Sequence, residues 1–355
     1  MNRIVLTYLI FYSSFIEIIS GNYSLRMLVL AISAVTLAIL NFRVFSTRKL
    51  YVVFLWFIGL SIAVIKGHNI FDTAFFLFWP INFALLFSKD FGNISQRTIR
   101  LLAVLSVFAF VAVELNLVVE NRQLSMPNLN ANGLSYACLS LFSFHYFFLV
   151  SDATNHLGNK IINWLAATIY FLIIIKMGSR MAVLVIVFLL LIYFYKKLQL
   201  SGNFLFKVWS ITTVFLVSLW FASISEIGKE FMAERFFLGK DNISILEDKS
   251  LLERFNMYQM LLDDLGIWIW SMKDYRPYPH NLFVELIMRL GLLGVFAVLV
   301  VIKSFRKAFI SLKGPNPRLL PIFFVVATIQ AMSSLSLEMN RAFFLGLAFV
   351  YNRRL

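Results

Sequence analysis

Residues 181–195 read MAVLVIVFLLLIYFY, an apolar stretch flanked by Arg180 on one side and by Lys196 and Lys197 on the other. With its flanks the stretch is long enough to cross the ~30 Å hydrocarbon core of a bilayer as a helix. Backbone groups in lipid must hydrogen-bond within their own segment, and the alternating pattern of a membrane barrel is absent. The stretch therefore predicts a membrane-spanning helix over residues 180–197.

The composition of the whole chain excludes a water-soluble protein. Of its 355 residues 60% are hydrophobic and 14% are charged, with a mean hydropathy of +0.82, whereas soluble domains are about 45–50% apolar and about 25% charged. The net charge of +14 does not indicate nucleic-acid binding, because the basic residues lie in short clusters between apolar runs. Cys138 is the only cysteine, which excludes an intrachain disulfide and a cysteine-based metal site.

Apolar runs of similar length recur along the chain. Together with residues 180–197 they predict an all-α polytopic membrane protein, a single domain over residues 1–355 with about twelve spans. The first run follows Arg3 directly and has no small-residue cleavage site, so we expect it to remain as a helix. The other predicted spans are 4–20, 25–42, 50–65, 70–88, 99–119, 132–150, 160–176, 206–224, 282–302, 318–336 and a short one at 340–352.

The positions of Lys and Arg predict the orientation of these spans. With both termini in the cytoplasm, the cytoplasmic ends carry 18 of the 32 basic residues, and the opposite short connections carry far fewer. One connection is longer: residues 225–281 hold 10 of the 18 acidic residues and 7 basic ones, and the alternation places them outside. Within this loop residues 226–237 and 251–270 predict short helices that cap the membrane domain.

Ionisable residues within or beside the spans gather near the predicted outer ends. Such residues are costly in a membrane, which makes each a candidate for function. Their common side favours a polar cavity that opens outward, while snorkelling and salt bridges between helices are the structural alternative. The residues are Glu17, Asp72, Glu114, Arg180, Glu285, Arg289, Glu338 and Arg341.

Residues 280–289 contain the most informative polar pattern. Asn281, Glu285 and Arg289 recur at four-residue steps and so share one face of a helix. A buried structural ion pair that orients the loop is the simpler interpretation of Glu285 and Arg289. His280 follows two prolines at the start of the span, where the helix dipole favours the neutral imidazole that can accept a proton from a hydroxyl. A purely structural histidine is the alternative.

Two arginines near the outer ends are candidate ligands for phosphate. Arg180 follows Gly178 and Ser179 at a helix N-terminus, and a guanidinium there suits phosphate oxygens. Arg254, in the outer loop, can supply a second guanidinium or pair with a nearby carboxylate. The alternative for Arg180 is a topology anchor. No metal-binding signature accompanies these residues.

Four segments together resemble the O-antigen polymerase and ligase superfamily. Residues 177–184 (MGSRMAVL) resemble its Ser-Arg signature, and residues 279–286 (PHNLFVEL), followed by 289–294 (RLGLLG), resemble its His-Asn motif and glycine-containing helix. Residues 126–133 (MPNLNANG) are similar to its Asn-rich entry into a middle span. The likeness covers residues 127–341 in order and spacing, and the earlier spans match only as generic apolar helices.

The resemblance implies a C-class glycosyltransferase-like fold in the bacterial inner membrane, acting at the periplasmic face without metal or other cofactor. By this resemblance Arg180 and Arg254 match the diphosphate-binding arginines, and His280 matches the catalytic histidine. Asn281, Glu285 and Arg289 are candidate supporting residues. The implied substrate is a glycan linked to undecaprenyl diphosphate, and the implied partners are membrane lipid and a candidate chain-length regulator protein, with no nucleic acid.

Two enzymes share these motifs and differ in their acceptor. A polymerase transfers the growing glycan to an incoming lipid-linked repeat unit, whereas a ligase transfers it to the lipopolysaccharide core. The Gly-Ser-Arg form favours the polymerase by resemblance. A transporter or flippase of lipid-linked sugars is an alternative from another class, and it predicts broken helices near the midplane and charges on both sides of the membrane.

Overall fold

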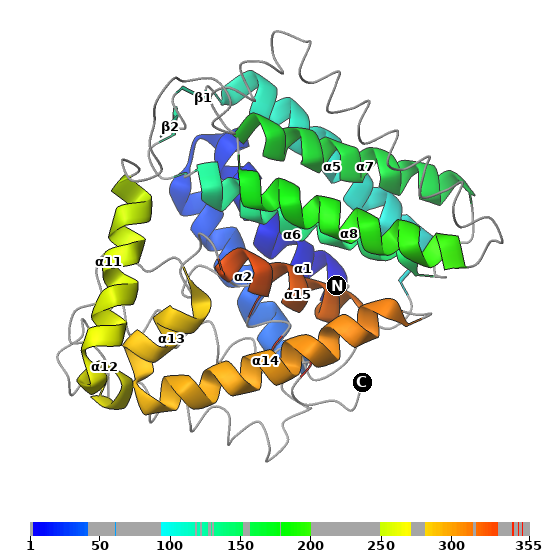
Figure 1. The fold of residues 1–355 in the computed structure, drawn as a ribbon. Helices are drawn as coiled ribbons and strands as arrows, with labels where there is room; N and C mark the ends of the chain where they lie inside the picture. The colour runs from blue at the N-terminus through cyan, green and yellow to red at the C-terminus, as the bar shows by residue number, and fades with distance from the viewer. Residues whose placement is uncertain are drawn as a thin grey trace, which may run out of the picture.

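The computed structural model describes residues 3–41, 61, 94–117, 119–120, 123–126, 129, 131–151, 157–177, 179–199, 249–270, 281–314, 317–332, 343, 347 and 350. These parts form a helical bundle with one short β-hairpin (Figure 1). In the hairpin β1 (Val119–Glu120) pairs antiparallel with β2 (Gln123–Leu124). The helices are α1 (Arg3–Ser20), α2 (Tyr23–Asn41), α5 (Gln96–Asn116), α6 (Ala131–Val150), α7 (Leu157–Met177), α8 (Arg180–Gln199), α11 (Lys249–Asp263), α12 (Leu265–Trp270), α13 (Leu282–Leu290), α14 (Leu292–Lys313) and α15 (Leu319–Ala331).

Several predicted spans are confirmed as helices. The spans predicted over 4–20, 25–42, 99–119, 132–150, 160–176 and 180–197 correspond to α1, α2, α5, α6, α7 and α8. The span predicted over 318–336 begins as α15, which is described as far as Met332. The spans predicted over 70–88 and 206–224, and the loop helix predicted over 226–237, lie outside the described residues. Of 50–65 only Ser61 is described, and of 340–352 only Phe343, Leu347 and Val350.

Four of the described helices, α1, α5, α6 and α7, are long and apolar enough to cross a membrane. The exposed side of α5 shows why lipid must surround them. Apolar side chains between 44% and 77% exposed recur there every three or four residues, which is one face of a helix. A helix face exposed to water would carry polar residues. We therefore expect lipid to cover this apolar face of α5. Its members are Leu101, Val104, Phe108, Val111 and Leu115.

Contacts between helices fix their relative directions. The Tyr8 and Tyr12 hydroxyls donate to the Leu102 and Leu105 carbonyls at 3.0 and 2.9 Å, so successive turns of α1 and α5 advance together. Near opposite ends of α5, Arg100 bonds Asn159 of α7 at 3.4 Å and Glu114 pairs with Lys176 at 2.8 Å. Helices α1, α5 and α7 are therefore parallel. These directions agree with the predicted alternation, while the face that meets the cytoplasm remains a prediction.

The core of the bundle is built around α6. This helix packs against α1, α7, α8 and α15, and most of its residues are buried. Aromatic rings fill the space between these helices. Phe144 of α6 lies against Tyr8 of α1 and Phe323 of α15, with ring centroids 5.1 and 5.0 Å apart. A helix that is apolar on every side is stable only when protein or lipid covers all of it.

The prediction of one continuous span over 282–302 is wrong. The chain breaks at Gly291, which has φ 56° and ψ −131° and separates α13 from α14. A side chain is strained in that conformation, whereas glycine adopts it readily. The two helices then fold back on each other so closely that a Cβ on Gly294 would lie 2.1 Å from the Leu286 carbonyl oxygen. We call this pair, Leu282–Leu290 with Leu292–Lys313, the α13–α14 hairpin.

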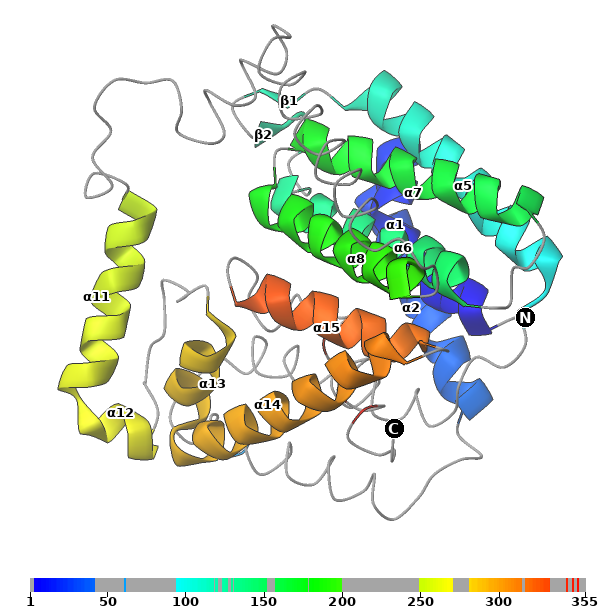
Figure 2. The same ribbon diagram turned by 45° about the vertical axis from the view of Figure 1, so that its right-hand side comes forward.

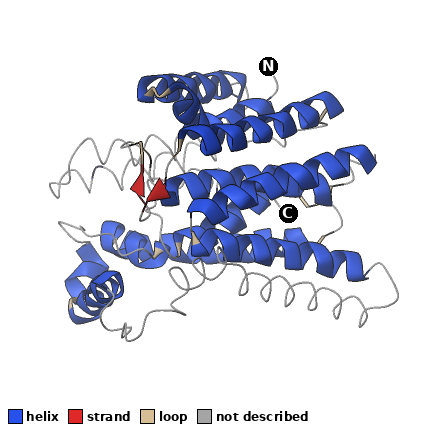
Figure 3. Cartoon of the chain, turned by 90° about the horizontal axis from the view of Figure 1, so that it is seen from above, coloured by secondary structure: helices blue, strands red, loops and turns tan. Residues whose placement is uncertain are grey.

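The predicted helicity of residues 251–270 is confirmed by α11 and α12. Helix α11 stands upright in Figures 1 and 2, while the bundle helices run across the view. Seen from above in Figure 3, α11 is viewed end-on and the bundle helices lie lengthwise. Helix α11 therefore crosses one end of the bundle, next to α13.

Candidate functional site

One end of the bundle gathers the helices that carry the predicted site residues. The first turn of α8, the helix α11, the helix α13 and the start of α14 all lie toward the left in Figure 1. The C-terminal ends of α1, α5 and α7 lie at the same end, since these helices are parallel. This is the end that the charge alternation predicts to be outside.

Asn281 is the N-cap of α13. Its side-chain oxygen accepts hydrogen bonds from the backbone amides of Phe283 and Val284 at 3.0 and 3.3 Å. Its own backbone is extended, with φ −142° and ψ 118°, as N-cap residues require. Asn281, which was predicted as a supporting residue, thus stabilises the start of α13. Its side chain accepts from backbone amides that the first turn of a helix leaves unpaired.

Glu285 and Arg289 form the ion pair that their spacing predicts. Their Oε1 and Nη2 atoms are 2.7 Å apart, and the residues are 1% and 7% exposed. Burial removes both charges from water, and the short contact offsets part of that cost within one helix turn. The geometry agrees with the structural interpretation, in which the pair stabilises α13.

The three residues predicted to act on substrate are described less fully. Arg180 is the first residue of α8 and follows Ser179, which is buried and whose carbonyl accepts from the Val183 amide at 3.2 Å. Arg254 lies in the second turn of α11. The side chains of both arginines lie outside the described structure, and so does the whole of His280, which directly precedes Asn281. The structure brings their helices to one end of the bundle and does not describe contacts among the three.

Other predicted outer-end charges form salt bridges. Glu17 of α1 pairs with Arg26 of α2 at 2.8 Å, and Glu114 of α5 pairs with Lys176 of α7, also at 2.8 Å. The first pair is largely buried, while the Glu114 and Lys176 side chains are 45% and 31% exposed. For Glu17 and Glu114 these contacts agree with the structural alternative, because each salt bridge joins two helices. The polar cavity stays a prediction.

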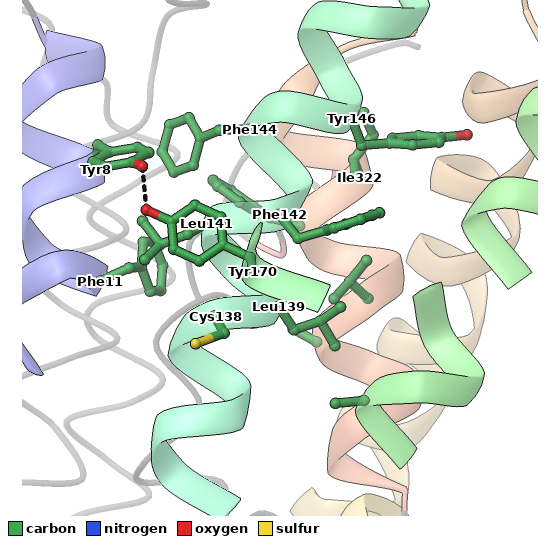
Figure 4. Packing of buried hydrophobic residues seen from close by; sticks show 14 of the residues in the cluster. Tyr8, Phe11, Cys138, Leu139, Leu141, Phe142, Phe144, Tyr146, Tyr170 and Ile322 are labelled. Carbon is green, nitrogen blue, oxygen red and sulfur yellow. Dashed lines mark hydrogen bonds between the residues drawn. The ribbon is translucent and has the colours of Figure 1, made fainter. Parts of the chain in front are cut away.

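A buried polar cluster around His145 was not predicted to matter. His145 is fully buried, its Nδ1 lies 2.9 Å from the Asn163 Oδ1, and its Nε2 lies 3.4 Å from the Tyr8 hydroxyl. The Tyr8 hydroxyl also bonds the Tyr170 hydroxyl at 2.5 Å (Figure 4). Tyr8, His145, Asn163 and Tyr170, here called the His145 cluster, come from α1, α6 and α7.

The tautomer of His145 follows from its neighbours. The Asn163 amide nitrogen donates to the Asn159 carbonyl at 2.7 Å, which turns the Asn163 oxygen toward His145. Nδ1 of His145 therefore carries the proton, and the unprotonated Nε2 faces the Tyr8 hydroxyl at 3.4 Å. A sequence signal existed, since His145 and Asn163 lie within predicted spans, where such polar side chains are costly unless they form hydrogen bonds.

Metal ligands do not cluster in the described part of the chain, where no group of three or more His, Cys, Asp or Glu residues is close enough to hold an ion. Comparison with models of known protein families gives no match, and comparison with curated proteins gives none either. Any functional assignment therefore depends on the residues themselves and on their positions in the bundle.

Proposed function

We propose that this protein is a membrane glycosyltransferase of the O-antigen polymerase type. It transfers a growing glycan from undecaprenyl diphosphate to an incoming lipid-linked repeat unit at the periplasmic face of the bacterial inner membrane. One observation carries the proposal: the first turn of α8, the helix α11 and the N-terminal end of α13 lie at the same end of the bundle (Figure 1). These are the positions of Arg180, Arg254 and the neighbour of His280.

Arg180 and Arg254 bind the diphosphate in this proposal. The leaving lipid diphosphate gains negative charge as its bond to the sugar breaks, and guanidinium groups stabilise that charge without a metal. The planar fork of arginine matches two phosphate oxygens at once. The start of α8 adds free backbone amides, which favour an anion at a helix N-terminus.

His280 activates the acceptor. As the acceptor hydroxyl oxygen bonds to the anomeric carbon, the bond from that carbon to the diphosphate oxygen breaks, and the hydroxyl proton passes to the His280 imidazole. Undecaprenyl diphosphate leaves with the electron pair, and direct displacement inverts the configuration. Asn281, Glu285 and Arg289 are positioning residues, since the cap and the buried pair hold the helix that begins just after His280.

The decisive experiment is a turnover assay on purified protein with a synthetic lipid-linked repeat unit. We expect His280→Ala to lower turnover by the ~10²–10⁴-fold typical of a general base, with donor binding retained. Chelators should leave the wild-type rate unchanged. Full activity in stably folded His280→Ala would exclude the catalytic role, and loss of donor binding would move His280 to the diphosphate site.

The arginines are tested by conservative replacement. Arg180→Lys and Arg254→Lys keep the charge but lose the planar fork, so donor binding should weaken in both variants. Arg306→Lys is the matched control, because Arg306 is exposed on the far part of α14. Equal loss of thermal stability and activity in Arg180→Lys and Arg254→Lys would assign these residues to the fold instead of the substrate.

The acceptor separates polymerase from ligase. Deletion of the gene should leave lipopolysaccharide that carries at most one repeat unit on its core. If the polymer still forms on undecaprenyl diphosphate but never reaches the core, the protein is a ligase.

The break at Gly291 favours a second candidate, a transporter of lipid-linked sugars. Only residues 292–302 of α14 are apolar before Lys303, and 11 helical residues cover about 17 Å, roughly half the hydrocarbon core. A helix broken at that depth is typical of transporters. Movement of a labelled lipid-linked repeat between the leaflets of proteoliposomes, without glycan transfer, would support this candidate.

A further inference from the structure

Helices α11 and α12 form a rigid bend across one end of the bundle. The Asp264 side chain between them accepts a hydrogen bond from the Gly266 amide at 2.7 Å, and the Trp268 indole donates to the Leu261 carbonyl at 2.6 Å. These bonds fix the angle between the two helices. We call residues 249–270 the α11–α12 elbow.

The inner side of the elbow packs on the hairpin. Met257 and Leu261 of α11 and Ile267 of α12 form one buried cluster with Ile287 and Met288 of α13. This contact explains one apolar stripe of α11, since residues four apart lie on the same side of a helix.

A second apolar stripe of the elbow faces away from the protein. Phe255 and Leu262 of α11 are 67% and 74% exposed, and Leu265 and Ile269 of α12 are 74% and 54% exposed. Phe255 and Leu262 are seven residues apart, which is two helix turns, so they share a face. In α12, Leu265 and Ile269 are four apart and share a face as well.

The polar residues of α11 occupy a separate face. Asn256, Gln259 and Asp263 are exposed and recur at three- and four-residue steps. At 100° per residue Asn256 and Asp263 are rotated by about 80–120° from Phe255 and Leu262, and Gln259 by about 40–60°. A helix with distinct apolar and polar exposed faces is the kind that lies in the plane of a membrane surface.

The direction and neighbours of the elbow fit that location. Helix α11 crosses the axes of the bundle helices in Figures 1 and 3, so it runs along the membrane plane when those helices span the bilayer. Helix α12 packs against α14. On α14 the apolar side chains of Leu292, Phe296 and Leu299 are 53% to 58% exposed, as on a helix face that lipid covers. The elbow thus continues a lipid-facing surface.

We infer that the α11–α12 elbow is embedded in the lipid interface at this end of the bundle, with Phe255, Leu262, Leu265 and Ile269 among the acyl chains and Gln259 and Asp263 toward water. Its partner is the bilayer itself. This inference stands on burial and direction and does not rest on the proposed enzyme activity. It places Arg254 on a helix at headgroup depth instead of in a free aqueous loop.

Spin labels on the full chain in lipid nanodiscs test the inference. Single cysteines replace Leu262 and Leu265 on the apolar stripe, with Gln259→Cys and Asp263→Cys as matched controls from the polar face. All four are made in a Cys138→Ala background. We expect the labels at 262 and 265 to relax strongly with oxygen and weakly with a water-soluble nickel chelate, and the labels at 259 and 263 to show the reverse.

Two outcomes would overturn the inference. Equal and high accessibility to the nickel chelate at all four sites would place the elbow in water. Low accessibility to both reagents at 262 and 265 would mean that protein covers the stripe. Because all four native side chains are exposed, each variant should match the thermal unfolding of its Cys138→Ala parent, which separates misfolding from a real change in depth.

Discussion

The centre of the bundle and the α13–α14 hairpin both bury polar side chains, but they satisfy them differently. In the His145 cluster the hydrogen bonds join residues of α1, α6 and α7 that are 18 to 162 positions apart. In the hairpin a charged pair, Glu285 and Arg289, forms within one turn of one helix. The first arrangement fixes helices relative to one another, and the second stabilises a single helix.

The two arrangements therefore have different structural roles. The hydrogen bonds of the His145 cluster connect α1, α6 and α7. Movement of one of these helices therefore breaks its contacts with the other two. The ion pair of the hairpin lies within α13, and the fold of the hairpin depends on Gly291 and on the close approach of Leu286 to Gly294. A substitution in the hairpin should therefore act on α13, next to the proposed site, and a substitution in the cluster should act on the whole bundle.

The largest effect is expected from Arg289→Met. Removing the guanidinium 2.7 Å from the buried Glu285 carboxylate should cost about 3–5 kcal/mol of local stability. Hydrogen exchange should rise in α13 and stay unchanged in α6. The double variant Glu285→Gln/Arg289→Met should recover much of the loss, because it removes both charges. Unchanged exchange in the single variant would show that the pair does not stabilise α13.

A smaller effect is expected from Gly294→Ala. The new methyl group would lie 2.1 Å from the Leu286 carbonyl oxygen, so the hairpin must open at a cost of about 1–3 kcal/mol. The control is Gly158→Ala, where a Cβ meets nothing within 4 Å. Thermal unfolding in detergent measures both, and equal behaviour of the two variants would contradict the close approach of α13 and α14.

A substitution in the His145 cluster should lower stability less than Gly294→Ala does, but it should affect more helices. Tyr8→Phe removes the hydroxyl that bonds Leu102, His145 and Tyr170, at a cost of about 1 kcal/mol. Hydrogen exchange should increase in α1, α6 and α7 together. Tyr23→Phe, at a residue 45% exposed in α2, is the control. An increase confined to α1 would mean that the cluster does not couple these helices.

The smallest effect is expected at the exposed salt bridge between Glu114 and Lys176. Both side chains are partly exposed, at 45% and 31%, so Glu114→Gln should change stability by less than about 1 kcal/mol, and high salt should reduce the difference further. Thermal unfolding at low and high salt checks this. A salt-independent loss as large as that of Arg289→Met would remove the contrast between exposed and buried pairs.

Much of the local structure could be predicted from the sequence. The apolar runs predict α1, α2, α5, α6, α7 and α8 because a helix in lipid needs only its own hydrogen bonds and about 20 apolar residues. The step of four residues predicts the contact between Glu285 and Arg289, because helix geometry alone brings such residues together. The position of Asn281 before the apolar run likewise fits an N-cap.

The sequence by itself determined the membrane class of the chain, the helices α1, α2, α5, α6, α7 and α8 and the local pair on α13, since each depends on interactions within one segment. Tertiary structure alone decided the break at Gly291, because a glycine inside an apolar run does not interrupt the hydrophobic pattern, and only the packing of Leu286 on Gly294 turns the chain back. It also decided the His145 cluster, in which Tyr8 and Tyr170 are 162 positions apart. No periodicity encodes such a contact, because it exists only after α1, α6 and α7 have packed.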